Sequence, residues 1–251
     1  MEHSLTQRQI LDVATSMGYR ILLCGGEANR AEDTVIRIGK AYGMDKVHVF
    51  AIATSIMVTM DKGDEAMTQT RRIARTNTDL DKLDKFNNLS REICRDKLDF
   101  DTIVARIREI DAMPVYPSWV MVLAYAIIGS AFAVFFGGGA AEFIVGFIVG
   151  ALIRPVIKIA DYLQSPPFFT NVAGAATTVI LIKLFTFVFT NLDVSATTIG
   201  VLMNLVPGVL LTNCIRDFVA TDYSAGTSKI METLLVAAAI ALGVGVSVLW
   251  R

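Results

Sequence analysis

Apolar and polar positions divide the chain into two unlike halves. Residues 1–112 mix charged and apolar side chains at short intervals, whereas residues 113–251 are mostly apolar with sparse charge. A bilayer core about 30 Å thick requires roughly 20 apolar residues in one helix. Five segments of the second half approach that length: residues 119–136, 143–160, 168–189, 194–215 and 230–250. The pattern therefore predicts a membrane protein in which a five-helix transmembrane α-bundle follows a separate N-terminal domain.

The first half changes its hydrophobic period along the chain. Apolar residues recur at helical spacing, then alternate with polar residues around turn signals, and finally return to helical spacing. We expect helices at residues 5–23, 31–42, 78–94 and 99–110, and three strands of a meander between residues 46 and 73. These elements predict a small α+β domain over residues 1–112, followed by a transmembrane domain over residues 113–251.

The distribution of lysine and arginine predicts the orientation in the membrane. The N-terminus carries no apolar leader segment, so the first domain is expected in the cytoplasm. The loops at residues 137–139 and 191–193 contain no lysine or arginine and are expected outside. The basic residues next to the spans then lie at inner helix ends: Arg154, Lys158, Arg216 and Lys229. Five spans place the C-terminus outside a cell membrane of the inner or plasma type.

Composition and motifs argue against several classes of function. The formal net charge of −1 gives no basic surface for nucleic acid. No phosphate-binding loop, nucleophile elbow or metal-ligand spacing appears, so we expect no enzyme activity, no catalytic residues, no metal and no cofactor. Cys24, Cys94 and Cys214 are widely spaced and are expected to be reduced thiols. His3 and His48 lack a partner motif and are expected to be structural or solvated.

The apolar segment at residues 194–215 is interrupted by Pro207-Gly208. A proline inside a helix removes one backbone hydrogen bond, here the one to the carbonyl of Met203, and crowds the preceding turn. A backbone carbonyl near Asn204 is thereby expected to be exposed within the apolar segment. Transporters often build their solute sites from such broken helices.

Polar side chains follow this proline at helical spacing. Asn213, Arg216 and Asp217 share one face if the helix continues, and Asp222 follows shortly afterwards. An amino-acid zwitterion needs donors for its carboxylate and acceptors for its ammonium group, and these residues supply both. The alternative is a kinked helix that ends in an interfacial Arg–Asp pair, and the residues alone leave both interpretations open.

Two further charged residues lie within or next to the predicted spans. Glu142 opens the second span, where a carboxylate either stabilises the helix N-terminus or acts as a protonatable gate. Lys183 lies about six residues from the outer end of the third span, where it either extends to the interface or takes part in coupling. Both are candidate coupling or gating residues.

Small residues predict close helix packing in the membrane. Gly146 and Gly150 form a GxxxG step, and Gly174-Ala-Ala and Ala237-Ala-Ala supply similar surfaces. These surfaces serve packing among the five helices or an interface between subunits, and the sequence favours neither.

Two segments of the chain resemble motifs of one family. Residues 205–226 read Leu-Val-Pro-Gly-Val-Leu-Leu-Thr-Asn-Cys-Ile-Arg-Asp-Phe-Val-Ala-Thr-Asp-Tyr-Ser-Ala-Gly and resemble the signature of the threonine/serine exporter family. Residues 25–34, Gly-Gly-Glu-Ala-Asn-Arg-Ala-Glu-Asp-Thr, resemble the N-terminal motif of that family. The resemblance covers nearly the whole chain, although Cys214 stands where a small residue, commonly glycine, is expected.

The resemblance implies a subunit of a transporter. Full-length members look like two membrane halves in one chain of about ten helices, whereas split members pair a longer protein with a short membrane-only partner. The chain is similar to the longer split form, so a membrane-only partner, a homo-oligomer or both are implied. By motif match, functional positions carry over to Pro207, Asn213, Arg216, Asp217 and Asp222.

The leading hypothesis is a secondary exporter of threonine/serine-like small amino acids, driven by the proton motive force that the resemblance implies. In this hypothesis Asn213 and Arg216 hold the substrate carboxylate, and carbonyls at the Pro207 kink accept from the ammonium group. Asp217 or Asp222 then titrates with transport.

Two other hypotheses remain. Because split relatives of the family are linked to dicarboxylate export, a succinate-type exporter subunit is the second, with Lys183 or Arg154 as an additional cationic contact. The third is a non-transporting membrane scaffold or sensor, whose cytoplasmic domain binds a ligand.

Overall fold

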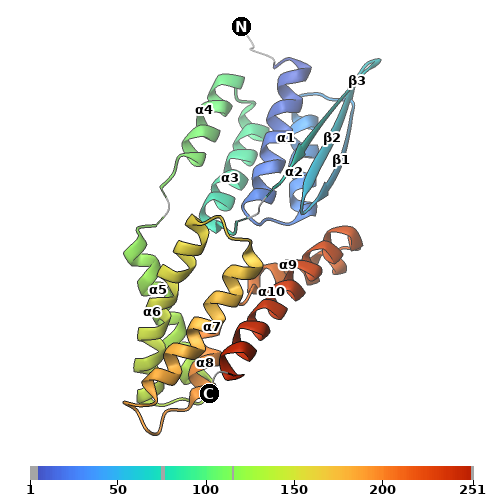
Figure 1. The fold of residues 1–251 in the computed structure, drawn as a ribbon. Helices are drawn as coiled ribbons and strands as arrows, with labels where there is room; N and C mark the ends of the chain where they lie inside the picture. The colour runs from blue at the N-terminus through green and yellow to red at the C-terminus, as the bar shows by residue number, and fades with distance from the viewer. Residues whose placement is uncertain (1–4, 75–76, 115, 250–251) are drawn as a thin grey trace. The chain divides into compact units, whose positions relative to one another are not determined.

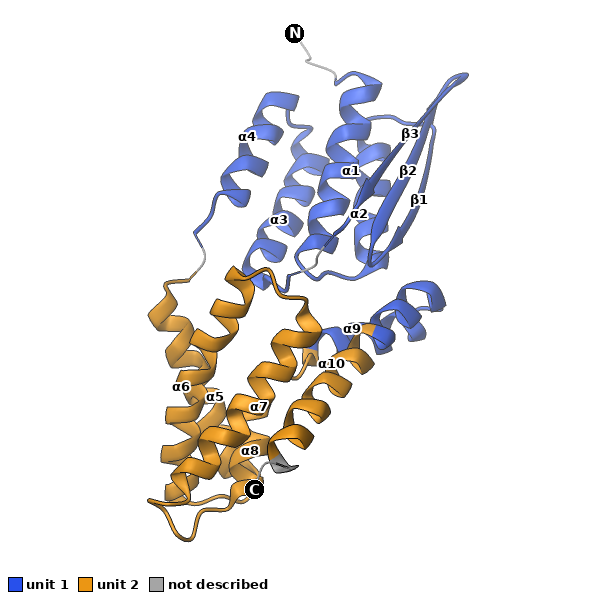
Figure 2. Ribbon diagram, viewed as in Figure 1, with its two compact units in different colours: residues 1–114, 209–231 blue, residues 115–208, 232–251 orange. Residues whose placement is uncertain are grey.

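A computed structural model describes residues 5–74, 77–114 and 116–249, and the chain forms two compact units (Figure 2). Unit 1 comprises Met1–Pro114 and Val209–Met231, and unit 2 comprises Val115–Gly208 and Glu232–Arg251. A segment of the second half of the sequence therefore belongs to the same unit as the N-terminal half. The boundary at residues 112 and 113 stays a prediction.

Unit 1 has the mixed architecture that the hydrophobic pattern predicts. Its elements are α1 (Gln7–Leu23), α2 (Ala28–Ala41), β1 (Lys46–Ile52), β2 (Ser55–Lys62), β3 (Glu65–Arg72), α3 (Leu80–Asp96), α4 (Phe100–Asp111), most of α9 (Gly208–Val219) and the first part of α10 (Tyr223–Leu249). The three strands form an antiparallel sheet in the order β1-β2-β3, beside α1 and α2 (Figure 1). The predicted helices and meander are confirmed.

Local sequence explains how α1 and β2 form the core of unit 1. Thr6 and Gln9 form a capping box that satisfies the first amides of α1. The helix then buries Ile10, Val13, Ala14, Met17 and Ile21, which recur every three or four residues. On β2, every second side chain is buried: Ile56, Val58 and Met60. One apolar helix stripe thus meets one apolar sheet face.

Unit 2 is entirely helical in the part that the structure describes. It contains α5 (Ser118–Phe135), α6 (Ala140–Tyr162), α7 (Pro167–Phe185), α8 (Val194–Leu202) and the second part of α10. Among the described residues, four helices are long and apolar enough to cross a membrane: α5, α6, α7 and residues Tyr223–Ser247 of α10. Trp250 and Arg251, which close the predicted last span, lie outside the described residues. The structure thus confirms four of the five expected spans as continuous helices.

The predicted fourth span, residues 194–215, is not one helix. It is divided into α8 and α9, with a non-helical connection from Met203 to Pro207. Pro207 has no backbone N–H, and its ring disfavours the helical conformation of Val206. The chain therefore ends one helix before the proline and starts another directly after it. A kink was expected from the sequence, whereas the structure shows a complete break.

Three side-chain contacts define the two ends of unit 2. At one end, Lys158 Nζ on α6 donates to Ser118 Oγ at the start of α5 (3.0 Å). At the other end, the backbone N–H of Asp193 donates to Glu142 Oε1 (2.8 Å), which joins the starts of α6 and α8. Lys183 Nζ, near the end of α7, donates to the carbonyl oxygen of Ser247 on α10 (2.8 Å). The C-terminal end of α10 and the start of α5 therefore lie at opposite ends of unit 2.

Glycines let α5 and α6 approach at backbone distance. A Cβ atom added to Gly146 would lie 2.8 Å from Gly129 O and 3.2 Å from Ser130 Cα. One added to Gly150 would lie 3.1 Å from Ala126 Cα. The GxxxG step therefore serves packing of α6 against α5 within the chain, as expected where small residues replace the hydrophobic effect in lipid.

We expect Gly146→Ala to lower stability by about 1–3 kcal/mol, because the added methyl group meets rigid backbone atoms of α5. The measurement is thermal unfolding of the purified chain in detergent micelles. Gly245→Ala on α10 is the matched control, since its added Cβ would find nothing within 4 Å. Equal stability of both variants would contradict this packing of α5 on α6.

Candidate functional site

A buried ion pair closes a helical hairpin in unit 1. Lys229 Nζ on α10 lies 2.6 Å from Asp217 Oδ2 on α9, and the two side chains are 6% and 1% exposed. Charges buried to this degree are tolerated when each has a close partner of opposite sign. The pair therefore fixes α9 against the first part of α10.

A second face of α9 contacts the connection between α1 and α2. Asn213 Nδ2 donates to the carbonyl oxygen of Gly25 (2.9 Å), and Arg216 forms an ion pair with Glu27. Gly25 adopts a positive φ of 83°, a conformation that favours glycine. The two segments that carry the family resemblance thus meet in unit 1.

Asp222 has a capping role at the start of α10. Its Oδ1 accepts from the backbone N–H of Ala225 (3.0 Å), as an N-cap carboxylate does. Burial raises the pKa of Glu32 on α2, a hydrogen bond from the backbone N–H of Ala51 (2.8 Å) opposes this rise, and the Asp222 carboxylate adds to it. Two carboxylates from the two motif segments therefore influence each other electrostatically.

The cysteines occupy packed positions. Cys214 is buried and its thiol donates to the carbonyl oxygen of Gly226 on α10 (3.3 Å). Its sulfur therefore lies in the contact between α9 and α10. Burial raises the pKa of the Cys24 thiol to about 11, so Cys24 is protonated at neutral pH. All three cysteines are free, as the sequence predicts.

Asn204 and Pro207 belong to unit 2, at the break between α8 and α9. Asn204 Nδ2 donates to the carbonyl oxygens of Tyr125 (3.2 Å) and Val201 (3.1 Å). Asn204 Oδ1 is buried and accepts no hydrogen bond within the described part of the chain. An unsatisfied buried acceptor is costly in free energy, so this oxygen is an unusual feature of the break.

The two residues considered for coupling or gating both hold helix ends together. Glu142 is buried and accepts from the backbone N–H groups of Gly139 (2.7 Å) and Asp193 (2.8 Å). Lys183 is half-buried and joins α7 to α10 through Ser247. Each therefore has a structural role, and a role in coupling or gating stays a prediction.

Sequence reasoning did not identify the partners of the motif residues. Lys229 was assigned only an orienting role at an inner helix end, and Glu27 was not singled out as a candidate. The available signal for Lys229 was a charged residue opening the long apolar run of α10, twelve positions after Asp217. No comparable signal pairs Arg216 with Glu27, which lies 189 positions away.

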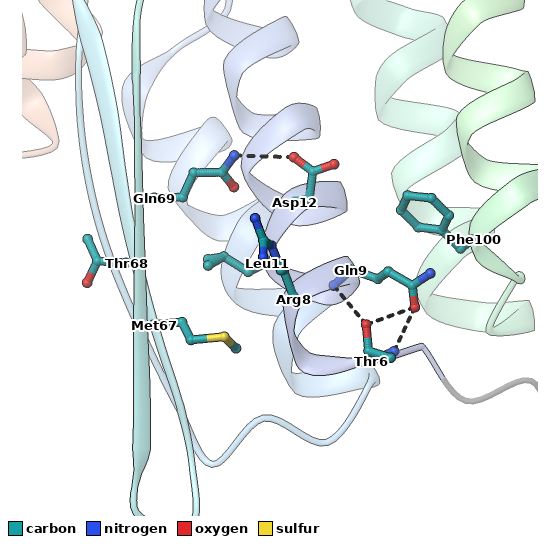
Figure 3. Close-up of a pocket in the computed structure, with 9 residues that line it drawn as sticks. All are labelled: Thr6, Arg8, Gln9, Leu11, Asp12, Met67, Thr68, Gln69 and Phe100. Carbon is teal, nitrogen blue, oxygen red and sulfur yellow. Dashed lines mark hydrogen bonds between the residues drawn. The ribbon is translucent and has the colours of Figure 1, made fainter.

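A separate cavity of about 790 Å³ lies among α1, β3 and α4 of unit 1 (Figure 3). Four of its polar side chains pair with one another: Gln9 accepts from Thr6, and Asp12 Oδ1 accepts from Gln69 Nε2 (3.2 Å). Asp12 also pairs with Arg71 at 2.6 Å. None of the motif residues lines this cavity, so it is not the candidate transport site.

We expect Lys229→Met to destabilise the protein by about 3–5 kcal/mol, because it leaves the Asp217 carboxylate buried without its partner. The double variant Asp217→Leu/Lys229→Met should regain most of that loss, since no buried charge remains. Thermal unfolding in detergent measures the stability of the wild type, the two single variants and the double variant, which together form a double-mutant cycle. Lys158→Met is the control for loss of a lysine, and additive effects of the two substitutions would contradict the coupling.

The chain is similar to known proteins over nearly its whole length. Residues 12–249 match the model of the family described as "Putative threonine/serine exporter". The "Probable succinate transporter subunit YjjP" of Klebsiella aerogenes is 24% identical over 95% of this chain and 92% of that protein. The protein of the same name from Escherichia coli K12 is 24% identical over 95% of this chain and 93% of that protein.

The third relative differs in length. The "Threonine/serine exporter" of Corynebacterium glutamicum is 25% identical over 95% of this chain, but the match covers only 50% of that protein. No solved structure matches the chain. The family model covers both motif segments and all four apolar helices that are long enough to cross a membrane in the described part of the chain. The chain is a multi-pass membrane protein and belongs to the threonine/serine exporter family of transporters.

Proposed function

We propose that the chain is the longer subunit of a secondary exporter of small amino acids of the threonine/serine type, coupled to protons. Membership of an exporter family supports transport. Two relatives of nearly the same length are named as transporter subunits, whereas the relative named as an exporter is about twice as long. These lengths support a separate, shorter membrane partner, with or without further copies of this chain.

The observation that carries this proposal is the break between α8 and α9. A helix interrupted in an apolar segment leaves backbone groups without their usual partners, and transporters use such groups to bind solutes. In unit 2, the break adjoins the unsatisfied Oδ1 of Asn204. This acceptor suits the ammonium or hydroxyl group of a small hydroxy amino acid.

In unit 1, the ion pair of Arg216 with Glu27 supports the proposal that Arg216 binds a substrate carboxylate. Glu27 presents to Arg216 the same chemical group that the substrate carries. Because these side chains are 59% and 22% exposed, their pair contributes only about 0–1 kcal/mol. A substrate carboxylate therefore competes with Glu27 for Arg216, and Asn213 is the second donor.

Proton coupling is assigned to Asp217. Protonation removes its negative charge, so the attraction between Asp217 and the buried Lys229 is lost. The α9–α10 hairpin is then destabilised relative to arrangements in which Lys229 reaches solvent. Asp222 is the second candidate, because it caps the same hairpin.

The proposed orientation has unit 1 helices α1–α4 in the cytoplasm and the C-terminus outside. Within unit 2, the end of α10 lies with the starts of α6 and α8, opposite the start of α5. The start of α5 and the end of α10 thus lie at opposite ends of unit 2, which supports the proposed topology. The loops at the proposed outer end, residues 137–139 and 191–193, contain no lysine or arginine.

A succinate-type dicarboxylate exporter subunit is the second candidate function. Both relatives that match this chain over nearly their whole length are named succinate transporter subunits. A substrate with two carboxylates needs a second cation besides Arg216, and Lys183 or Arg154 in unit 2 is the proposed residue. Arg154 lies over the ring of Tyr125, with its guanidinium carbon 5.5 Å from the ring centroid.

Reconstituted transport tests the main proposal. The chain and its membrane partner are placed in proteoliposomes loaded with labelled threonine, and efflux is measured under an imposed pH gradient. Asp217→Asn should lose at least about tenfold of the gradient-driven rate, because its side chain no longer exchanges a proton. Asp64→Asn in the β2–β3 turn is the control. Equal gradient-driven rates for wild type and Asp217→Asn would reject the proton role.

Efflux measured for two substitutions of Lys183 separates the two candidate functions. If succinate is the substrate, Lys183→Met should abolish succinate efflux, whereas Lys183→Arg should retain most of it because the charge remains. If threonine is the substrate, both variants should export threonine at similar rates. Succinate efflux that is unimpaired in Lys183→Met would count against Lys183 as the second carboxylate contact.

A further inference from the structure

Arginines gather around a second cavity of unit 1, away from the motif contacts. The cavity has a volume of about 510 Å³ and lies between α2 and α3, which pack against each other. Its charged lining consists of Arg30, Arg37, Arg91, Arg95 and Asp33. Four guanidinium groups therefore face one carboxylate, in a chain whose formal net charge is −1.

Helical spacing places these arginines in two facing rows. Arg30 and Arg37 are seven positions apart, or two turns of α2, and Arg91 and Arg95 are one turn apart on α3. The opposite faces of both helices pack into the core of unit 1. Val35 does so on α2, and buried apolar residues do so on α3. The rows are thus held by packing and not by the arginines themselves.

Two of the four guanidinium groups have no carboxylate partner within the described part of the chain. Arg37 pairs with Asp33 (2.7 Å) and Arg95 with Asp96 (2.8 Å). Arg91 makes only a hydrogen bond of 3.3 Å to Asn88 Oδ1, and Arg30 makes none among the described residues. Cations brought together in this way repel one another unless an anion lies between them.

We propose that this cavity binds a small soluble anion with two or more carboxylate or phosphate groups, as a ligand of the cytoplasmic part of the protein. Guanidinium groups bind both kinds of oxyanion in the bidentate manner. The volume lies in the usual range of small-molecule sites. The cavity has no aromatic lining, so it offers a nucleobase no stacking surface and suits a compact polyanion.

Arg30 and Asp33 belong to the N-terminal motif segment, but no residue of this cavity takes part in the contacts of Asn213 and Arg216. The site therefore does not depend on the proposed transport function. Its nearest reporter is Cys94, which lines the cavity and is half-buried. Cys24 and Cys214 are buried and should react slowly. Alkylation of Cys94 therefore reports whether the cavity is occupied.

The experiment measures the rate of Cys94 alkylation by N-ethylmaleimide in the full chain, purified in detergent. Citrate, succinate and pyrophosphate are titrated separately. Chloride is the control anion and keeps the ionic strength constant. We expect saturable protection by at least one of these anions. Arg30→Gln/Arg91→Gln should weaken that protection at least about tenfold, because both free guanidinium groups are lost.

Three controls keep the outcome decisive. Arg72→Gln on β3, an exposed arginine outside the cavity, should leave protection unchanged. Circular dichroism and thermal unfolding establish that the double variant is folded, and the wild-type titration tests the site without any variant. The absence of saturable protection by all three anions would overturn the proposal. Protection by vesicles containing anionic phospholipid, with none by the soluble anions, would also overturn it.

Discussion

The ion pair between Asp217 and Lys229 determines how the segment after Pro207 is placed. Both side chains are almost completely buried, so neither charge can leave the other without a large desolvation cost. With α9 fixed to α10 in this way, the neighbouring face of α9 carries Asn213 and Arg216 toward the connection between α1 and α2. One buried contact thus brings together two motifs that are about 190 positions apart in the sequence.

Much of the fold could be predicted from periodicity because one face of each element is buried locally. The stripe from Ile10 to Ile21 identifies α1 with nearly correct bounds, and the alternation from Ile56 to Met60 identifies β2 as a strand within the predicted meander. The fourth span was wrong as a single helix because apolar composition is the same on both sides of a backbone break. Pro207 indicated the position of the break, but its extent depends on how residues 203–206 satisfy their amides.

The residues of the candidate site stay a prediction, and the sequence did not identify the contacts that they make in the structure. Asn213, Arg216 and Asp217 were expected on one helix face, but consecutive residues of an α-helix are rotated by about 100°. Arg216 and Asp217 are consecutive, and they indeed pair with different partners, Glu27 and Lys229. Neither partner can be found from spacing, because a contact across 189 positions leaves no periodic trace.

The two ion pairs of α9 differ in a way that suits an exporter. The pair of Arg216 with Glu27 is partly exposed, so water can replace either partner at little cost in free energy. The pair of Asp217 with Lys229 is buried, so it opens only when one charge is removed. In the proposed mechanism the exposed pair therefore responds to substrate and the buried pair responds to protons. Because both pairs lie on one short helix, a movement of α9 that follows protonation of Asp217 also changes the position of Arg216, and this shared helix links proton binding to substrate binding.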